Sequence, residues 1–273
     1  MPFYMMALRR VFALARRKRI DAVLSRDPGF LPYLCIIKKM AGIPVFYETH
    51  NFFMDVSSQP DLRQNLRFRE KYHRIERCCI PSMDGLLCLL TPQAELYRRY
   101  FPSHRICVAH PGVNPLKPPK GSLYERKCIG YVGGLQARRD IEMLFQAFKL
   151  IGDHALRLLI IGGRKKEMPR VQQWLEKYDL NDRVTVTGWV SYVELERLLD
   201  KISVGVVPMK DTFYNRYLTA PIKIFDYLSR GIPVVAADLP SAREFIEDGK
   251  EGVFYKPEAP GDLASAIFRL LQS

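Results

Sequence analysis

The sequence predicts an α/β fold made of two doubly wound domains, each with a parallel sheet. Short apolar runs recur along the chain, and amphipathic stretches long enough for a helix separate most of them, which is typical of right-handed βαβ units. One segment breaks this alternation: the residues P-G-V-N-P-L-K-P-P-K at 111–120 suit an extended linker. We therefore expect an N-terminal domain over residues 1–116 and a C-terminal domain over residues 117–273.

Composition and charge narrow the classes of partner. The 273 residues are 48% hydrophobic, which is ample for packed cores and excludes global disorder. The formal net charge of +13 indicates an anionic partner: a phosphate-bearing substrate, an anionic membrane surface or nucleic acid. The arginines are scattered over several expected helices and form no recognition motif, so we expect no nucleic-acid partner.

The cysteines and the longest apolar runs bear on the compartment. The six cysteines show neither C-x-x-C pairs nor metal-spaced histidines, and most fall in apolar stretches. We expect small buried thiols in a reducing, cytoplasmic compartment, with no metal site and no cofactor. No run approaches the roughly 18 apolar residues of a membrane-spanning helix.

The N-terminal residues 1–19 predict a basic amphipathic helix. Phe3, Met6, Val11 and Leu14 can form its apolar side, with six Arg and Lys residues elsewhere on the helix. Two interpretations stay open: an outer helix packed on a sheet, or a helix that rests on an anionic surface at the inner face of a membrane.

Apolar runs and helical periodicity then define the elements of the first domain in order. The expected strands are 21–25, 43–48, 85–89 and 105–109, and the expected helices between them are 30–40, 62–79 and 92–100. These strands are too few for a complete doubly wound domain.

The second domain restarts the alternation. The expected strands are 128–132, 156–161, 183–187, 202–208, 232–236 and 252–255, which suffice for a complete doubly wound sheet. Asp140 is expected to cap one helix, and capping boxes at Ser191 with Glu194 and at Ser241 with Glu244 are expected to start two others.

The stretch P-I-K-I-F-D-Y-L-S-R-G-I-P-V-V at 221–235 predicts a helix that runs directly into a buried strand. Pro221 suits the first helical position and Gly231 suits a left-handed residue that ends the helix. Lys223 and Asp226 lie three residues apart and share one face. They are either an ordinary solvent-facing ion pair or a cation for a phosphate beside a carboxylate for a sugar hydroxyl.

Further candidates follow strands, where ligands of open α/β sheets bind. Gly133 and Gly134 follow one strand and precede Arg138 and Arg139, so backbone N–H groups and guanidinium groups could approach a phosphate, although a tight turn with exposed arginines explains them equally. His50 ends another strand, as a catalytic group or as a loop hydrogen-bonding group.

Taken together, these stretches resemble glycosyltransferases of the GT-B fold, in particular the large retaining group 4. The resemblance spans nearly the whole chain in the family's order. It is carried by I-P-V-F-Y-E-T-H at 43–50, V-A-H-P-G-V-N at 108–114, Y-V-G-G-L-Q-A-R-R-D at 131–140, L-L-I-I-G-G at 158–163, V-T-V-T-G-W-V at 184–190, S-V-G-V-V-P at 203–208, the stretch at 221–235, and A-R-E-F-I-E-D-G-K-E-G-V-F-Y at 242–255.

The resemblance implies two Rossmann-like domains facing a cleft, with a nucleotide-sugar donor, a UDP- or GDP-sugar, on the second. It implies diphosphate contacts from Gly133, Ile222 and Lys223 and from Arg139, which replaces the usual Lys. Gly134 stands where many members carry Arg. Asp226 replaces the usual ribose-binding Glu, the segment with Trp189 and Val190 lies near the nucleobase, and His50 faces the donor sugar.

The resemblance also implies what the reaction is. Transfer would go with retention to an unidentified glycan or lipid-linked acceptor, as in the synthesis of a polysaccharide. The first domain lacks strands that family members have before Asp21, and the helix expected after Ser273 is missing, so we expect a chain shortened at both ends. The alternative is therefore an impaired or split member that acts as a donor-binding or partner-binding subunit.

Overall fold

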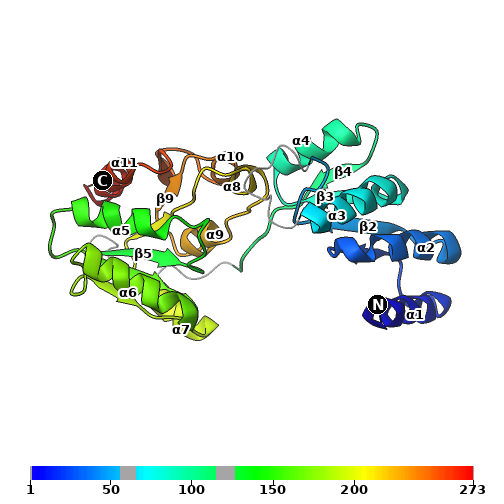
Figure 1. Ribbon diagram of the computed structural model, residues 1–273, viewed down its shortest axis with the longest axis horizontal. Coiled ribbons are helices and arrows are strands. Elements are labelled where there is room, and N and C mark those ends of the chain that lie inside the picture. Colours follow the sequence, from blue (N-terminus) through cyan, green and yellow to red (C-terminus); the bar gives the residue numbers. More distant parts are fainter. Residues whose placement is uncertain (1, 56–65, 115–126, 273) are drawn as a thin grey trace. The chain divides into compact units, whose positions relative to one another are not determined.

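The computed structural model describes residues 2–55, 66–114 and 127–272, and they divide into two compact units. The first unit is Met1–Pro111 with Tyr217–Ala220, and the second is Gly112–Arg216 with Pro221–Ser273. The boundary that we expected at 116/117 lies outside the described residues, as does most of the expected linker. Each unit is α/β, with the strands and helices labelled in Figure 1.

The first unit contains a four-stranded parallel sheet in which the strands follow their sequence order. The strands are β1 (Val23–Ser25), β2 (Val45–Thr49), β3 (Gly85–Cys88) and β4 (Ile106–Val108). Its helices are α1 (Pro2–Arg16), α2 (Leu31–Ala41), α3 (Leu66–Cys79) and α4 (Thr91–Tyr100). The strands fall where the apolar runs predict them, because both faces of a parallel sheet are covered.

A fully buried glutamate connects three parts of the first unit. Glu76 on α3 accepts hydrogen bonds from the hydroxyls of Tyr47 on β2 and Tyr97 on α4, each at 3.0 Å, and from the N–H of Phe53 at 3.3 Å. Burial raises the pKa of the Glu76 carboxyl to about 8. The loop that follows β2 is therefore fixed from inside the core.

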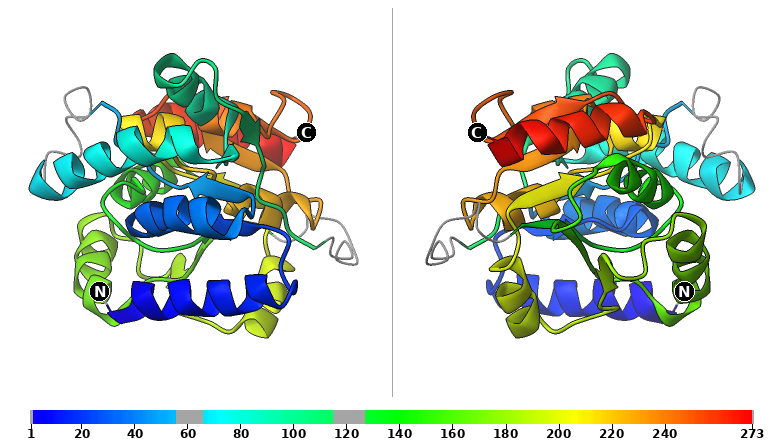
Figure 2. Two further views of the ribbon diagram at one scale, coloured as in Figure 1. Left: turned by 90° about the vertical axis from the view of Figure 1, so that its right-hand side faces the viewer. Right: turned by 90° about the vertical axis from the view of Figure 1, so that its left-hand side faces the viewer.

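The N-terminal helix α1 packs on α2 with a face that the sequence did not predict. Leu8 is buried, whereas Phe3 and Met6, which belong to the predicted apolar side, are each 64% exposed. In both views of Figure 2, α1 runs alongside α2. Val11 and Leu14 of the same side are half-buried, so the interpretation as a packed outer helix does not hold for Phe3 and Met6, and the interpretation as a surface-binding helix stays a prediction.

The second unit holds a six-stranded parallel sheet in the order β10-β9-β8-β5-β6-β7. The sheet begins at its centre with β5, adds β6 and β7 on one side, and then returns to add β8, β9 and β10 on the other. The strands are β5 (Cys128–Val132), β6 (Arg157–Ile161), β7 (Val184–Val186), β8 (Val204–Val207), β9 (Val234–Ala237) and β10 (Gly252–Tyr255). This is the order of a doubly wound dinucleotide-binding sheet.

Helices connect and cover these strands. They are α5 (Ile141–Leu150), α6 (Met168–Lys177), α7 (Tyr192–Leu199), α8 (Phe213–Tyr217), α9 (Lys223–Leu228), α10 (Pro240–Arg243) and α11 (Pro260–Gln272). The apolar stripe of α5, with Leu144, Phe145 and Phe148, is fully buried, and α11 lies beside α5 (Figure 1).

The predicted capping residues of the helices are confirmed only in part. Ser191 accepts a hydrogen bond from the N–H of Glu194, as a cap should, and Gly231 has φ +68°, the left-handed value that ends α9. Asp140 occupies the cap position of α5 but makes no capping hydrogen bond. The expected capping box at Ser241 is wrong, because Ser241 lies inside α10, whose cap position is Leu239, and its hydroxyl donates to the carbonyl of Asn215.

Candidate functional site

The strand order places a candidate site at the middle of the second sheet. β5 and β8 are neighbours there, and the chain leaves them in opposite directions along the sheet. Ligands of such sheets bind outside the carboxyl ends of the strands at this reversal. Gly133 directly follows β5, and α9 comes after β8.

Two glycines let the loops after β5 and β6 approach each other. Gly133 and Gly162 have φ of +136° and +127°, which side chains other than glycine rarely adopt. A Cβ atom at Gly162 would lie 2.3 Å from the carbonyl oxygen of Gly133. The backbone after β5 is consequently held close to the end of β6.

Lys223, the first residue of α9, lies against this loop. Its side chain is 8% exposed, and its ammonium lies 5.4 Å from the centre of the Tyr131 ring. A Cβ atom at Gly133 would be 3.5 Å from the Lys223 nitrogen. Burial, with a further contribution from the charge of Arg139, lowers the pKa of Lys223 to about 7.

The ammonium of Lys223 has no hydrogen-bond or ion-pair partner among the residues that the structure describes. Asp226 lies close enough to affect the pKa of Lys223 but forms no ion pair with it. Asp226 is itself partly buried, and burial raises the pKa of its carboxyl. The interpretation as a solvent-facing ion pair is therefore wrong, and a buried cation without an anion remains.

Arg139 adds a second cation at the same place. Its guanidinium is partly buried, and its Nη1 is shielded from water and has no hydrogen-bond partner in the described part of the chain. Burial lowers the pKa of Arg139, with an additional effect of the Arg138 charge. Buried cations normally have an anionic partner, so this cluster has the chemistry of an anion-binding site.

Two tyrosines that the sequence analysis did not single out position these groups. The hydroxyl of Tyr131 donates to the carbonyl of Gly134 at 2.6 Å. The hydroxyl of Tyr227, on α9, donates to the carbonyl of Gly130 at 3.0 Å and accepts from the N–H of Val132 at 2.9 Å. These bonds attach α9 to β5. The sequence could have indicated these two tyrosines only through the general rule that a buried tyrosine hydroxyl needs a hydrogen-bond partner.

The other predicted donor contacts lie around this cluster. Ile222 immediately precedes α9 and is 53% exposed. Val190 follows β7 and packs partly against the core, and Trp189 beside it is exposed. A backbone bridge between Gly162 and Gly188 joins the loops after β6 and β7. The structure thus brings Gly133, Arg139, Lys223 and Asp226 together, and Ile222 directly precedes Lys223 in the chain.

His50, the predicted catalytic residue, belongs to the first unit. It follows β2, and its Nε2 lies 2.6 Å from Oε1 of Glu48 on the same strand. This contact fixes the imidazole at the end of the strand. The role expected for His50 stays a prediction.

The remaining candidate features are the cysteines, possible metal ligands and possible membrane-spanning helices. Cys79, Cys88 and Cys128 are buried as expected, whereas Cys78 and Cys107 are exposed. Within residues 2–55, 66–114 and 127–272, no group of three or more His, Cys, Asp and Glu side chains could hold a metal ion. In the same residues, no helix has the length and apolar content needed to cross a membrane.

Comparison with known proteins finds similar sequences and similar structures. Over 150 residues, 55% of this chain, it is 27% identical to the alpha-D-kanosaminyltransferase of Streptomyces kanamyceticus, and it spans only 37% of that protein's length. The structure resembles sucrose-phosphate synthase from Thermosynechococcus elongatus with a TM-score of 0.75 and 20% identity, over 97% of this chain and 68% of that one. It also resembles Anabaena HepE in complex with UDP and glucose, with a TM-score of 0.70 and 15% identity, over 96% and 72% of the two chains.

The likeness to these solved structures shows the fold, which is GT-B as expected. A match to a family model shows the protein family, which the fold alone does not. The family described as "Glycosyl transferases group 1" matches residues 126–273, which is more than half of the chain and contains the whole described sheet of the second unit. The chain belongs to the glycosyl transferases of group 1.

Proposed function

We propose that this chain transfers a sugar from a nucleotide-sugar donor, a UDP- or GDP-sugar, to a glycan or lipid-linked acceptor with retention. One observation carries the proposal: Lys223 is buried against the loop after β5 with its ammonium unpaired in the described residues, beside the shielded Arg139 guanidinium. A diphosphate supplies the missing negative charge. The similarity to HepE, which was solved with UDP and glucose, supports UDP as the first nucleotide to test.

Each predicted donor residue has a role in this proposal. Lys223 and Arg139 bind the diphosphate, together with the backbone of Gly133 and Gly134 and the helix start at Ile222. The Asp226 carboxylate accepts hydrogen bonds from the ribose hydroxyls. The segment with Val190 borders the nucleobase.

The same cations favour the chemical step. When the bond between the sugar and the diphosphate breaks, negative charge grows on the leaving phosphate oxygen. Preformed cations in a shielded site stabilise that charge without reorganising water around it. The proposal keeps His50 as a contact of the donor sugar and assigns no protein nucleophile.

The acceptor and the place of action also belong to the proposal. The net charge of +13 supports an anionic acceptor or surface, such as a polysaccharide or a lipid-linked precursor made in the cytoplasm at the inner face of a membrane. The name of the kanosaminyltransferase relative states the group that it transfers and no acceptor, so it gives no acceptor for this chain.

Donor consumption tests the proposal. The chain is incubated with UDP-glucose, GDP-mannose and other nucleotide sugars in the presence of glycan and lipid-linked acceptors, and release of the nucleoside diphosphate is followed alongside calorimetric binding. A retaining transferase is supported if the donor binds, the nucleoside diphosphate is released, and NMR shows an α-linked product from an α-linked donor. Binding without release supports the alternative of a donor-binding subunit. Absence of binding to every nucleotide sugar contradicts both.

A further inference from the structure

The helix pair α1 and α2 exposes large apolar side chains on the surface of the first unit. Phe3 and Met6 on α1 are each 64% exposed, and Met40 on α2 is 72% exposed. Met5 and Ile36 are also exposed. Single exposed apolar residues are ordinary, but several on two adjacent helices form a surface that water does not favour.

Exposed arginines border these apolar residues. Arg9 and Arg16 lie seven residues apart on α1 and are therefore aligned along one side of the helix, while Arg10 follows Arg9 and Arg17 follows the end of the helix. The helix α1 contains no Asp or Glu, and Lys18 and Arg19 continue the positive charge. In the described part of the chain, none of the four arginines has an ion-pair partner.

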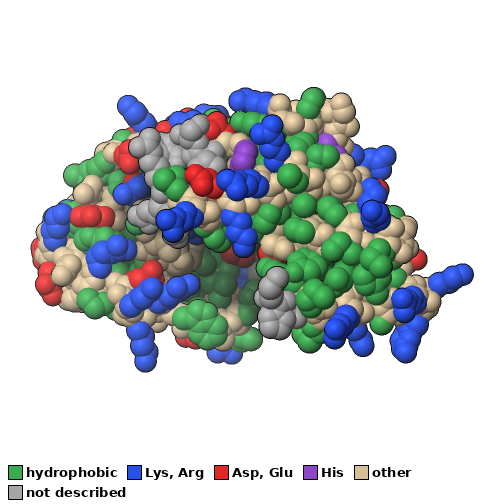
Figure 3. Space-filling model, turned by 45° about the vertical axis from the view of Figure 1, so that its right-hand side comes forward, with side chains coloured by type: hydrophobic (Ala, Val, Ile, Leu, Met, Phe, Trp, Pro, Cys, Tyr) green, Lys and Arg blue, Asp and Glu red, His purple; other side chains and the backbone are tan. Residues whose placement is uncertain are grey.

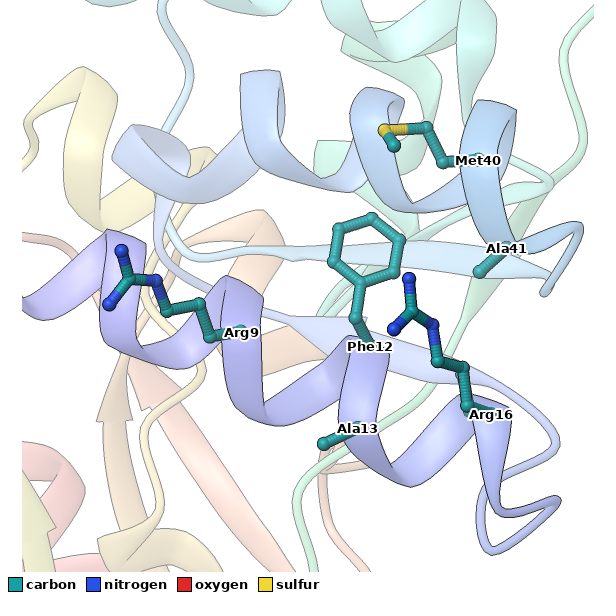
Figure 4. Close-up of a pocket in the computed structure, with 7 residues that line it drawn as sticks. Arg9, Phe12, Ala13, Arg16, Met40 and Ala41 are labelled. Atoms are coloured by element: carbon teal, nitrogen blue, oxygen red, sulfur yellow. The ribbon is translucent and has the colours of Figure 1, made fainter.

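An open groove between the two helices combines both chemistries. Its volume is about 500 Å³, and Phe12 and Ala13 of α1 and Met40 and Ala41 of α2 line it. Figure 4 shows the Phe12 ring between the guanidinium groups of Arg9 and Arg16, with Met40 opposite on α2. An apolar groove with a cation toward each end complements an amphiphile that has an anionic head group.

We propose that α1 and α2 form a docking surface for an anionic phospholipid bilayer. In this arrangement Phe3, Met6 and Met40 enter the boundary of the acyl chains, and the exposed arginines of α1 contact the lipid phosphates. A face of the molecule with clustered hydrophobic side chains and Lys or Arg around them is visible in Figure 3. Positive charge that no Asp or Glu of α1 balances complements an anionic lipid surface.

The docking surface is independent of the donor site, so each can fail without the other. The test is sedimentation of the chain with vesicles of phosphatidylglycerol and phosphatidylcholine, or of phosphatidylcholine alone. We expect binding to the anionic vesicles that weakens at high salt, and at least about tenfold weaker binding to the neutral vesicles, because each cation near an anionic surface contributes roughly fivefold.

Matched variants assign the binding to α1. Arg9→Gln with Arg16→Gln is expected to weaken binding to anionic vesicles about tenfold or more, whereas Arg98→Gln with Arg99→Gln, the same charge change on exposed residues of α4, leaves it nearly unchanged. Equal loss in both variants, or no sedimentation of the wild type with anionic vesicles, overturns the proposal. So does light scattering that shows a dimer which Met6→Ser with Met40→Ser converts to a monomer, because a second copy then covers the face.

Discussion

Lys223 is the residue at which stability and the proposed function oppose each other. Its ammonium is buried without an anion in the described residues, and its pKa falls to about 7 because burial disfavours the charged form. An uncompensated buried cation costs free energy that an apolar side chain would not. A residue of this kind is explained when a ligand supplies the opposite charge.

Replacing Lys223 by Met is therefore expected to stabilise the fold and to weaken donor binding. The lysine pKa is 10.5 when unperturbed and about 7 in the folded chain. The folded state is thus penalised in full below pH 7, and the penalty is relieved as the pH rises toward 10.5. We expect Lys223→Met to raise the free energy of unfolding by a few kcal/mol at neutral pH, with a gain that shrinks above it. Urea unfolding at several pH values measures this.

The pH dependence of donor binding follows from the same group. A UDP-sugar has no phosphate group that titrates near neutrality, so the change reports the protein. Affinity is expected to be highest while Lys223 is protonated and to fall as the pH rises through about 7. Calorimetry on Lys223→Arg is the control, because the guanidinium stays charged and the affinity should then be flat. An equally steep fall in Lys223→Arg would assign the titration to another group.

The Asp226 carboxylate is the proposed partner of the ribose hydroxyls, and its removal tests that contact. Asp226→Ala is expected to weaken UDP-sugar binding by roughly 10- to 100-fold, the usual effect of losing hydrogen bonds to a charged group, while the thermal midpoint stays near that of the wild type. Asp182→Ala, an exposed aspartate of the same unit, is the matched control. Unchanged affinity in Asp226→Ala, or unchanged preference for ribose over deoxyribose nucleotides, contradicts the assignment.

At the residue scale the sequence predicted which side chains meet but not their environment. The spacing of Lys223 and Asp226 put both on one face of a short helix, and the structure agrees. Their burial could not be predicted, because lysine is rarely buried and the covering groups come from distant parts of the chain. Tyr131 was inconspicuous for the same reason: its partner, the Gly134 carbonyl, depends on the loop conformation.

At the scale of elements, the close approach of the loops after β5 and β6 depends on Gly162. Gly162→Ala forces a Cβ atom to 2.3 Å from the Gly133 carbonyl, at a φ of +127°. We expect a loss of about 3 kcal/mol in the free energy of unfolding, together with weaker donor binding because the Gly133 loop moves. Gly152→Ala, where no atom lies within 4 Å, is the control and should change stability by less than about 1 kcal/mol. Equal effects of the two variants would refute this account of the loops.

The first unit has its own pH-dependent element, the buried Glu76 that connects α3 with β2 and α4. Its pKa is about 8 in the folded chain against 4.5 unperturbed. The folded state binds the proton more tightly, so stability is complete below pH 4.5 and falls as the pH rises through 8. We expect Glu76→Gln to abolish this fall, as measured by unfolding between about pH 5 and pH 9. A fall of the same size in Glu76→Gln would assign it elsewhere.

The elements themselves were largely predictable, but their ends were not. Strands in both units lie where apolar runs indicated them, since buried parallel strands are apolar on both faces. The capping box at Ser241 failed because the helix already begins at Pro240, and the Ser241 hydroxyl instead donates to the Asn215 carbonyl, 26 residues away in the chain. A local capping pattern in the sequence is thus overridden by contacts that form only in the tertiary structure.

At the scale of the whole molecule, the sequence indicated two α/β units but not the order of their strands. Alternation of strands and helices is local, whereas the position of β5 between β8 and β6 depends on where the chain reverses across the sheet. That reversal decides which strand ends meet, and hence that the loop after β5 and the helix α9 form one site. The resemblance to the family, carried by the order of its motifs, indicated in advance that the loop after β5 and the helix α9 share one site. The spacing of the residues alone did not indicate this.

The measurement that tests the central claim most directly is calorimetric titration of the wild type and of Lys223→Met with UDP-glucose, GDP-mannose and ADP-glucose. The account predicts that the wild type binds at least one of these donors. It predicts that Lys223→Met, although more stable, binds that donor about tenfold or more weakly. Since the variant is the more stable protein, its weaker binding cannot come from unfolding. Equal affinity of the two proteins, or no binding of any donor to the wild type, would contradict the site.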